Sequence, residues 1–413
     1  MLKVYSDNLL AGNLFKPESE TNKYHFAYQE HCPPESAVSL SMPVVNEHYA
    51  SDDKSLHPVF DMNLPEGALA ERLRKEFSKV VPNFDALAML KIVGQSQIGR
   101  LRFALAGEEI ADMPAENLSD LLAHDGAEGL FESLLSRYAV HSGISGAMPK
   151  VLVRDIKGPT EWHRMTHRGA THIVKAWTSE YPRLAENEYF CMRAAKHAKL
   201  EVPNLELSKG GQFLIVERFD LKNEKYLGFE DFCVLNGKTA HQKYDGTYES
   251  IVKRIKDFVS PEQVRPALEQ FFKALALSCA LKNGDAHLKN FGVLYENPES
   301  TVWLSPIYDL VTTTAYKPSD ILALNLGGTK RWPKATALKA FARAHCNITD
   351  GRARALLEEV LQGVLCAASE ARLYMHRNAQ FRYVGAVMLT EWNQGLNLSI
   401  QPADQPVQFE ITD

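Results

Sequence analysis

The stretch Asn283-Gly-Asp-Ala-His-Leu-Lys-Asn290 is the part of the sequence that decides the fold. Asp285 and Asn290 have the Asp-x-x-x-x-Asn spacing of a kinase catalytic loop. In such a loop the Asp accepts the proton of the attacking hydroxyl, and the Asn five residues later binds a metal ion. This spacing alone is a weak signal because it arises often by chance, so its interpretation depends on the residues that follow.

Two apolar runs follow the octapeptide, Phe291–Tyr295 and Thr301–Leu304, and the turn-forming segment 296–300 separates them. This pattern predicts a β-hairpin. The second run leads to Asp309, which is placed to supply a second carboxylate just past the returning strand. The sequence therefore predicts a phosphoryl-transfer site with Asp285 as base and with Asn290 and Asp309 as Mg²⁺ ligands. The competing interpretation is a polar loop with an Asn turn and a buried Asp cap.

The composition is that of an ordinary globular protein. A chain of 413 residues is long enough for two or three domains, and its net charge of −5 argues against strong autonomous binding of nucleic acid. The six cysteines are scattered without a Cys-x-x-Cys pair, which favours reduced thiols. We see neither a signal peptide nor an apolar run long enough to span a membrane. A cytoplasmic location is expected.

The order of the expected elements favours an α+β, two-lobed protein-kinase-like fold. We expect an N-terminal α/β subdomain at 1–105, a strand-rich ATP-binding lobe at 106–220 and a mainly helical catalytic lobe at 221–413. The strand-rich part includes an apolar strand at 213–219. Apolar spacing predicts the helices 184–199, 248–258, 264–281, 335–345, 351–375 and 378–398.

Three further features lie where an ATP site would need them. The segment 143–150 is glycine-containing and ends in Lys150, so its backbone N–H groups could approach phosphate oxygens. Lys175 lies in an apolar strand, where its charge needs an anion, either a nucleotide phosphate or Glu188. Glu217–Phe219 ends the last strand before the helical half and could pair with adenine. Taken singly, these features also fit a plain turn, an exposed strand lysine and turn chemistry, respectively.

The chain resembles the HipA family of toxin kinases over nearly its whole length. The resemblance rests on the Asn-x-Asp-x-His-x-Lys-Asn loop, Tyr308-Asp309, Gly-Ala-x-x-Lys at 146–150, Asn-Glu-Tyr at 187–189, Val-Glu-Arg-Phe-Asp at 216–220, Leu-Ser-Met-Pro at 40–43 and Asn-Leu-Pro-Glu-Gly at 63–67. It implies a phosphatidylinositol-kinase-like two-lobed fold and a protein serine/threonine kinase. It also implies pairing with a HipB-type helix-turn-helix antitoxin in a bacterium, and contact with operator DNA mainly through that antitoxin.

Carried over residue by residue, the resemblance keeps Asp285 as the catalytic base and Asn290 and Asp309 as the metal ligands. It assigns contacts with ATP to Ser145, Gly146, Ala147, Met148, Pro149, Lys150, Lys175, Glu217, Arg218, Phe219, His287, Leu288, Lys289, Asn290, Tyr308 and Asp309. Two positions depart from the family pattern. Met148 stands where many members have Gln, and Gly143 stands where the inhibitory phospho-acceptor serine commonly falls. Ser142 and Ser145 flank Gly143 and are the candidate autophosphorylation sites, with Ser142 preferred as the acceptor.

The leading hypothesis is therefore an ATP- and Mg²⁺-dependent protein kinase that acts as a growth-arresting toxin, with an aminoacyl-tRNA synthetase as the suggested substrate. One alternative is a small-molecule kinase of the aminoglycoside phosphotransferase type, against which the N-terminal subdomain speaks. The other is an antitoxin-bound transcriptional corepressor, against which the intact Asp285, Asn290 and Asp309 speak.

Overall fold

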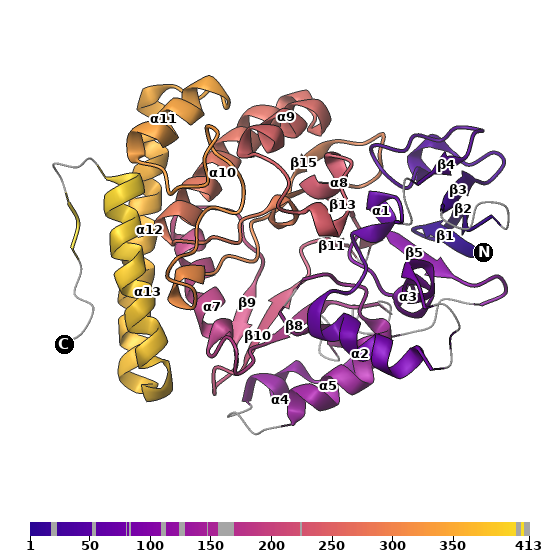
Figure 1. Ribbon diagram of the computed structural model, residues 1–413, viewed down its shortest axis with the longest axis horizontal. Coiled ribbons are helices and arrows are strands. Elements are labelled where there is room, and N and C mark those ends of the chain that lie inside the picture. The colour runs from indigo at the N-terminus through magenta and orange to yellow at the C-terminus, as the bar shows by residue number, and fades with distance from the viewer. Residues whose placement is uncertain are drawn as a thin grey trace. The chain divides into compact units, whose positions relative to one another are not determined.

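The computed structural model describes residues 1–17, 23–51, 55–79, 81, 84–108, 113–123, 129–146, 148–155, 169–223, 225–401 and 406–408. The chain forms two compact units (Figure 1). Unit 1 consists of Met1–Ala176, Ser208–Gln242 and Gly292–Val302, and unit 2 consists of Trp177–Leu207, Lys243–Phe291 and Trp303–Asp413. The division at residues 105 and 220 that the sequence suggests stays a prediction.

The first sheet of unit 1 is built from the N-terminal hundred residues. Its strand order is β4-β3-β2-β1-β5, with every neighbouring pair antiparallel. The strands are β1 (Leu2–Ser6), β2 (Leu9–Phe15), β3 (His25–Tyr28), β4 (Tyr49–Ala50) and β5 (Leu101–Ala104). Burial alternates along β1, as expected of a strand with one face on the core. The helices of this region are α1 (Pro58–Asp61), α2 (Gly67–Phe77) and α3 (Ala86–Val93). Phe60 of α1 and Leu90 of α3 pack into the same core.

The second sheet of unit 1 carries the strands that the sequence assigns to nucleotide binding. Its neighbouring strands are, in order, β6 (Ala115–Glu116), β7 (Lys150–Asp155), β8 (His172–Ala176) and β10 (Phe213–Glu217). Pairing is parallel between β6 and β7 and antiparallel beyond. The first four residues of β7 are all buried, a pattern typical of a strand covered on both faces. The helices α4 (Leu118–Ala123) and α5 (Leu130–Tyr138) contribute Leu121 and Leu134 to its core.

The hairpin predicted after the octapeptide is confirmed. The strands β14 (Gly292–Tyr295) and β15 (Val302–Leu304) are neighbours in a sheet of order β13-β14-β15, in which β13 (Gly228–Asp231) pairs antiparallel with β14. Before β13 lie two short paired strands, β11 (Leu221–Lys222) and β12 (Lys225–Tyr226), and after it the short helix α8 (Phe232–Leu235).

Unit 2 is mainly helical. Besides the short strand β9 (Leu205–Leu207), it contains α7 (Leu184–His197), α9 (Tyr248–Phe258), α10 (Pro261–Ala280), α11 (Ala335–Ala344), α12 (Asp350–Arg377) and α13 (Arg382–Gly395). These helices confirm the predicted ones, with one notable shift. The last was expected from residue 378, but the buried Phe381 closes a 3-10 turn over Ala379–Phe381, so α13 begins only at Arg382. Within the described part of the chain, no helix is long and apolar enough to cross a membrane.

Candidate active site

The backbone of the octapeptide 283–290 is shaped where the chain leaves α10. Lys282 adopts the left-handed conformation with φ of 55°, which ends the helix. Gly284 then passes so close to Asp320 that a Cβ atom at this position would collide with the Asp320 carboxylate. The N–H of Gly284 donates to Oγ1 of Thr313 at 2.8 Å. A side chain at 284 would therefore require Asp320 and the backbone of Ile321 to move.

Two tyrosine hydroxyls hold the carbonyl groups of this loop. The buried hydroxyl of Tyr248, on α9, donates to the Ala286 carbonyl at 3.1 Å, and burial raises the pKa of Tyr248 well above its usual value. The hydroxyl of Tyr308 donates to the Lys289 carbonyl at 2.7 Å. The loop is thus held both by α9 and by the segment after the hairpin.

Asp285 is the exposed carboxylate of an otherwise buried segment. Its side chain is 47% exposed, whereas Leu288, Lys289 and Asn290 are all buried. Its Oδ1 accepts a hydrogen bond of 2.6 Å from the hydroxyl of Tyr244. An accessible carboxylate on a fixed backbone can take a proton from an incoming hydroxyl, which is the chemistry expected of a base.

Asn290 and Asp309 lie on segments that are joined by a hydrogen bond. The hydrogen bond from Tyr308 to the Lys289 carbonyl joins the residues that directly precede the two candidate ligands. Oδ1 of Asn290 accepts from the N–H of His287 at 3.2 Å, which fixes the amide and leaves its oxygen a second lone pair. Asp309 is half-buried and adopts a left-handed conformation with φ of 55°, a state that Asp tolerates better than most residues and that is often found at functional sites.

Lys150 and Lys175 lie directly opposite one another in the β7–β8 pair. Residues opposite one another in an antiparallel pair place their side chains on the same face. Only 5% of Lys150 and 4% of Lys175 are exposed. A Cβ atom at Gly146, where φ is 120°, would collide with the ammonium group of Lys150. The Lys150 side chain therefore lies against the glycine-containing segment 143–150, called the glycine segment below. Two buried ammonium groups on one face could serve an anionic ligand, because lysine forms charge-assisted hydrogen bonds with phosphate oxygens.

Comparison with known proteins places the chain in a family. A model described as the HipA-like C-terminal domain matches residues 142–368, and one described as the HipA N-terminal domain matches residues 2–104. The first match alone covers more than half of the chain. The chain belongs to the HipA family.

Two relatives from Sinorhizobium fredii are similar to this chain over different lengths. "Putative kinase Y4dM" is 33% identical over 179 residues, which are 40% of this chain and 42% of that protein. "Putative kinase Y4mE" is 26% identical over 348 residues, which are 79% of this chain and 81% of that protein. The chain therefore spans less than half of the first relative and most of the second.

A solved structure shows the fold of this HipA-family chain. It is the Shewanella oneidensis toxin–antitoxin complex of HipA, HipB and operator DNA, and it matches with a TM-score of 0.71 at 18% identity, covering 96% of this chain and 98% of that chain. At this identity the likeness concerns the fold alone. The predicted α+β, two-lobed kinase-like fold is thereby confirmed.

The glycine segment of this HipA-family chain departs from the common pattern for a packing reason. A Cβ atom at Gly143 would collide with the carboxamide of the buried Gln97, so a serine there would require that side chain to move. The neighbouring Ser142 is fully buried: its Oγ donates to the Tyr138 carbonyl at 2.7 Å and accepts from the Leu152 N–H at 2.9 Å. This burial speaks against the preference for Ser142 as a phosphate acceptor in the folded protein.

The rest of this segment is more accessible. Ser145, Gly146, Met148 and Pro149 are half-buried, and the Pro149 carbonyl accepts from the N–H of Ala176 at 3.0 Å, at the end of β8. Ala147, also assigned to ATP binding, lies outside the described residues. Ser145 is therefore the more accessible of the two candidate phospho-acceptors.

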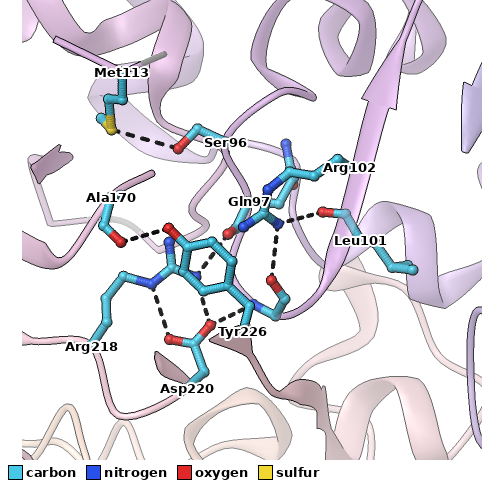
Figure 2. Close-up of polar contacts among 10 residues, drawn as sticks. Ser96, Gln97, Leu101, Arg102, Met113, Ala170, Arg218, Asp220 and Tyr226 are labelled. Atoms are coloured by element: carbon cyan, nitrogen blue, oxygen red, sulfur yellow. Dashed lines mark hydrogen bonds and ion pairs between the residues drawn. The ribbon is translucent and has the colours of Figure 1, made fainter. Parts of the chain in front are cut away.

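Glu217, Arg218 and Phe219 differ in their surroundings. Glu217 is exposed, and the Phe219 ring packs edge-on against Phe229 at 5.7 Å between centroids. The Arg218 guanidinium is buried and pairs with Asp220 through Nε at 3.0 Å and Nη2 at 2.6 Å (Figure 2). The side chain of Arg218 thus has a structural partner, and the contact of this segment with ATP stays a prediction.

The residues that contact the loop from outside it are not signalled by the sequence. Tyr244 and Tyr248 precede Asp285 by about forty residues, and Asp320 follows it by 35. No local spacing links these positions to the octapeptide. The signal that could have singled out Tyr244 is a tyrosine in an otherwise polar stretch just before a helix, which is weak evidence by itself.

Proposed function

We propose that this HipA-family chain is an ATP- and Mg²⁺-dependent protein serine/threonine kinase that acts as the toxin of a bacterial toxin–antitoxin pair. The observation that carries the proposal is the exposed carboxylate of Asp285 on a loop that is otherwise buried and braced. The loop is followed by the hairpin and by Asp309 in the order that kinase chemistry needs.

In the proposed reaction Asp285 takes the proton of a serine or threonine hydroxyl. The hydroxyl oxygen forms a bond to the γ-phosphorus of ATP, and the bond from that phosphorus to the β,γ-bridging oxygen breaks, so that ADP leaves with the bonding electron pair. Phosphoryl transfer of this kind depends mainly on positioning and on compensation of charge. The chain supplies positioning through the braced loop and supplies charge through the two buried lysines.

The residues present fit ATP and a magnesium ion. Lys150 and Lys175 offer two positive charges on one face, as phosphate oxygens require. In the described residues, no group of three or more His, Cys, Asp and Glu side chains could hold a metal ion. A site made of one carboxylate and one amide oxygen, from Asp309 and Asn290, suits Mg²⁺, which is usually bound through one or two carboxylates plus substrate phosphates. When bound, the ion would compensate the negative charge of those phosphates.

The partner and the substrate are proposed from the family. The Shewanella oneidensis relative is found in a complex with HipB and operator DNA, so we propose a HipB-like antitoxin for this chain, with DNA contacted mainly through that antitoxin. For the substrate we propose a cellular protein, with an aminoacyl-tRNA synthetase as the first to test.

The test is incubation of the purified protein with γ-labelled ATP and bacterial lysate, with Mg²⁺ or with a chelator. We expect labelled protein bands only with Mg²⁺, and none with Asp309→Ala. Asp309→Ala should also lose Mg²⁺-dependent ATP affinity. The matched control is Asp257→Ala, at an exposed aspartate of α9, which should keep both phosphate transfer and ATP affinity. Label on small molecules and never on protein would favour the aminoglycoside-type alternative. Wild-type turnover by Asp309→Ala at saturating Mg²⁺ would remove the metal-ligand role.

A further inference from the structure

Tyr244 makes a direct contact with the candidate base. Its hydroxyl donates to Oδ1 of Asp285 at 2.6 Å, and its ring stands edge-on to the His287 ring at 5.0 Å between centroids. Nε2 of His287 lies 3.9 Å from the same carboxylate oxygen. Both contacts fall on Oδ1, so the carboxylate is held by one oxygen and can turn Oδ2 toward an incoming hydroxyl.

The backbone on both sides of Tyr244 is tied to the catalytic loop. The Lys243 carbonyl accepts from the N–H of Leu288 at 3.1 Å. Gly246 runs against the Leu288 side chain, whose methyl carbons would lie 3.2 Å from a Cβ atom at this position. The phenol therefore approaches Asp285 from a segment that is fixed to the loop on either side. Tyr244 is itself exposed, but the fixed backbone on both sides distinguishes its contact with Asp285 from one made by chance.

A hydrogen bond from a phenol leaves Asp285 better able to act as a base than an ion pair with a cationic side chain would. A phenol donates one hydrogen bond and carries no charge, so it orients the carboxylate without neutralising it. A lysine or arginine at this place would also orient Asp285 but would compete for its charge. A base that is oriented by a third group is a recurrent arrangement in enzymes.

We propose that Tyr244 is the positioning residue of Asp285, holding Oδ1 so that Oδ2 faces the hydroxyl to be phosphorylated. This inference rests on the proposed kinase function. Tyr244 acts through Asp285 and not through ATP, so its hydroxyl contributes to the transfer step and not to nucleotide affinity. Removing it should lower kcat and leave the KM for ATP unchanged.

The experiment compares Tyr244→Phe with wild type in steady-state phosphate transfer. We expect kcat to fall by about tenfold to a hundredfold, with the KM for ATP within about twofold of wild type. The matched control is Tyr316→Phe, which also removes one phenol hydrogen bond in unit 2, in this case to the Pro182 carbonyl at 3.1 Å. It should change neither constant by more than about twofold.

A second measurement tests the contact without relying on activity. Urea unfolding of Tyr244→Phe, Asp285→Ala and the double variant forms a cycle in which interacting residues give non-additive shifts. Additive shifts would show that Tyr244 and Asp285 do not couple in solution and would overturn the proposal. Non-additive shifts with an unchanged kcat in Tyr244→Phe would also overturn it. If the cycle is non-additive but wild type transfers no phosphate, then the contact exists and the proposed kinase function is wrong. The positioning role of Tyr244 is then wrong as well.

Discussion

Asp285 in unit 2 and Asp220 in unit 1 are two carboxylates that differ in exposure and in the charge of their hydrogen-bond donors. Asp220 is buried, receives two hydrogen bonds from the Arg218 guanidinium and accepts a third from the N–H of Gly99 at 2.6 Å. Asp285 is half exposed and accepts one hydrogen bond from a neutral phenol. The difference teaches that a carboxylate becomes structural when its charge is fully compensated, and remains available for chemistry when it is only oriented.

The surroundings of Asp220 extend this contrast. The ring of Tyr226 has the guanidinium groups of Arg102 and Arg218 each 4.3 Å from its centroid, and its hydroxyl donates to the Ala170 carbonyl at 2.7 Å (Figure 2). Although burial opposes the charged form, the Arg218 charge and its hydrogen bonds keep the pKa of Asp220 below its usual value. This network ties β5 to the end of β10 and contains no exposed charge.

The largest effect is expected from Asp285→Ala. Loss of a general base costs about 10²- to 10⁴-fold in rate, so phosphate transfer should become undetectable in a labelled-ATP assay. ATP affinity should stay near wild type, because Asp285 orients the attacking hydroxyl and not the nucleotide. The free energy of unfolding should fall by no more than about 1 kcal/mol, the usual contribution of one hydrogen bond such as that from Tyr244. Full growth arrest and operator binding by Asp285→Asn would instead favour the corepressor alternative.

Asp220→Ala should show the reverse profile. Removing one partner of a buried ion pair leaves Arg218 uncompensated, which typically costs about 3–5 kcal/mol in the free energy of unfolding. Urea unfolding followed by circular dichroism measures this. The matched control is Asp257→Ala, which breaks the exposed pair with Arg254 and should cost no more than about 1 kcal/mol. Equal losses in the two variants would show that burial does not separate these aspartates.

Lys175→Met tests a buried charge that we assign to function. The substitution should raise the KM for ATP and lower kcat, each by about tenfold, the size of one lost charge-assisted contact. It should leave the protein folded without nucleotide, with an unfolding free energy unchanged or higher, since a methionine of similar length is less costly to bury than an ammonium group. Steady-state kinetics and urea unfolding measure the two parts. Unfolding of Lys175→Met together with unchanged ATP binding would make Lys175 structural, like Arg218.

The smallest effect is a pH dependence of stability. Because the pKa of Asp220 is lowered in the folded protein, its contribution to stability is complete above the usual value of 3.8 and is lost as pH falls through the lower folded value. The urea midpoint of wild type should therefore drop on acidification below about pH 4 more steeply than that of Asp220→Asn. Parallel slopes would show that Asp220 does not titrate in this range.

The sequence by itself determined the order of the elements and singled out the candidate reacting groups. The octapeptide, the hairpin and the helices of unit 2 are encoded by local spacing and apolar periodicity, which depend on near neighbours in the chain. Roles for Asp285, Asn290 and Asp309 could be predicted because their separations along the chain are short and are typical of a kinase catalytic loop. Lys175 was singled out because a lysine in an apolar strand is costly.

Only the tertiary structure decided which of these groups are accessible and what orients them. It buried Ser142 between the Tyr138 carbonyl and the Leu152 N–H, and it filled the space at Gly143 with Gln97. It also paired Arg218 with Asp220 and brought Tyr244 to Asp285 from 41 residues away. Burial and hydrogen bonding between distant segments depend on how strands and helices pack. That packing leaves no periodic trace in the sequence, so the environment of a side chain has to be seen in three dimensions.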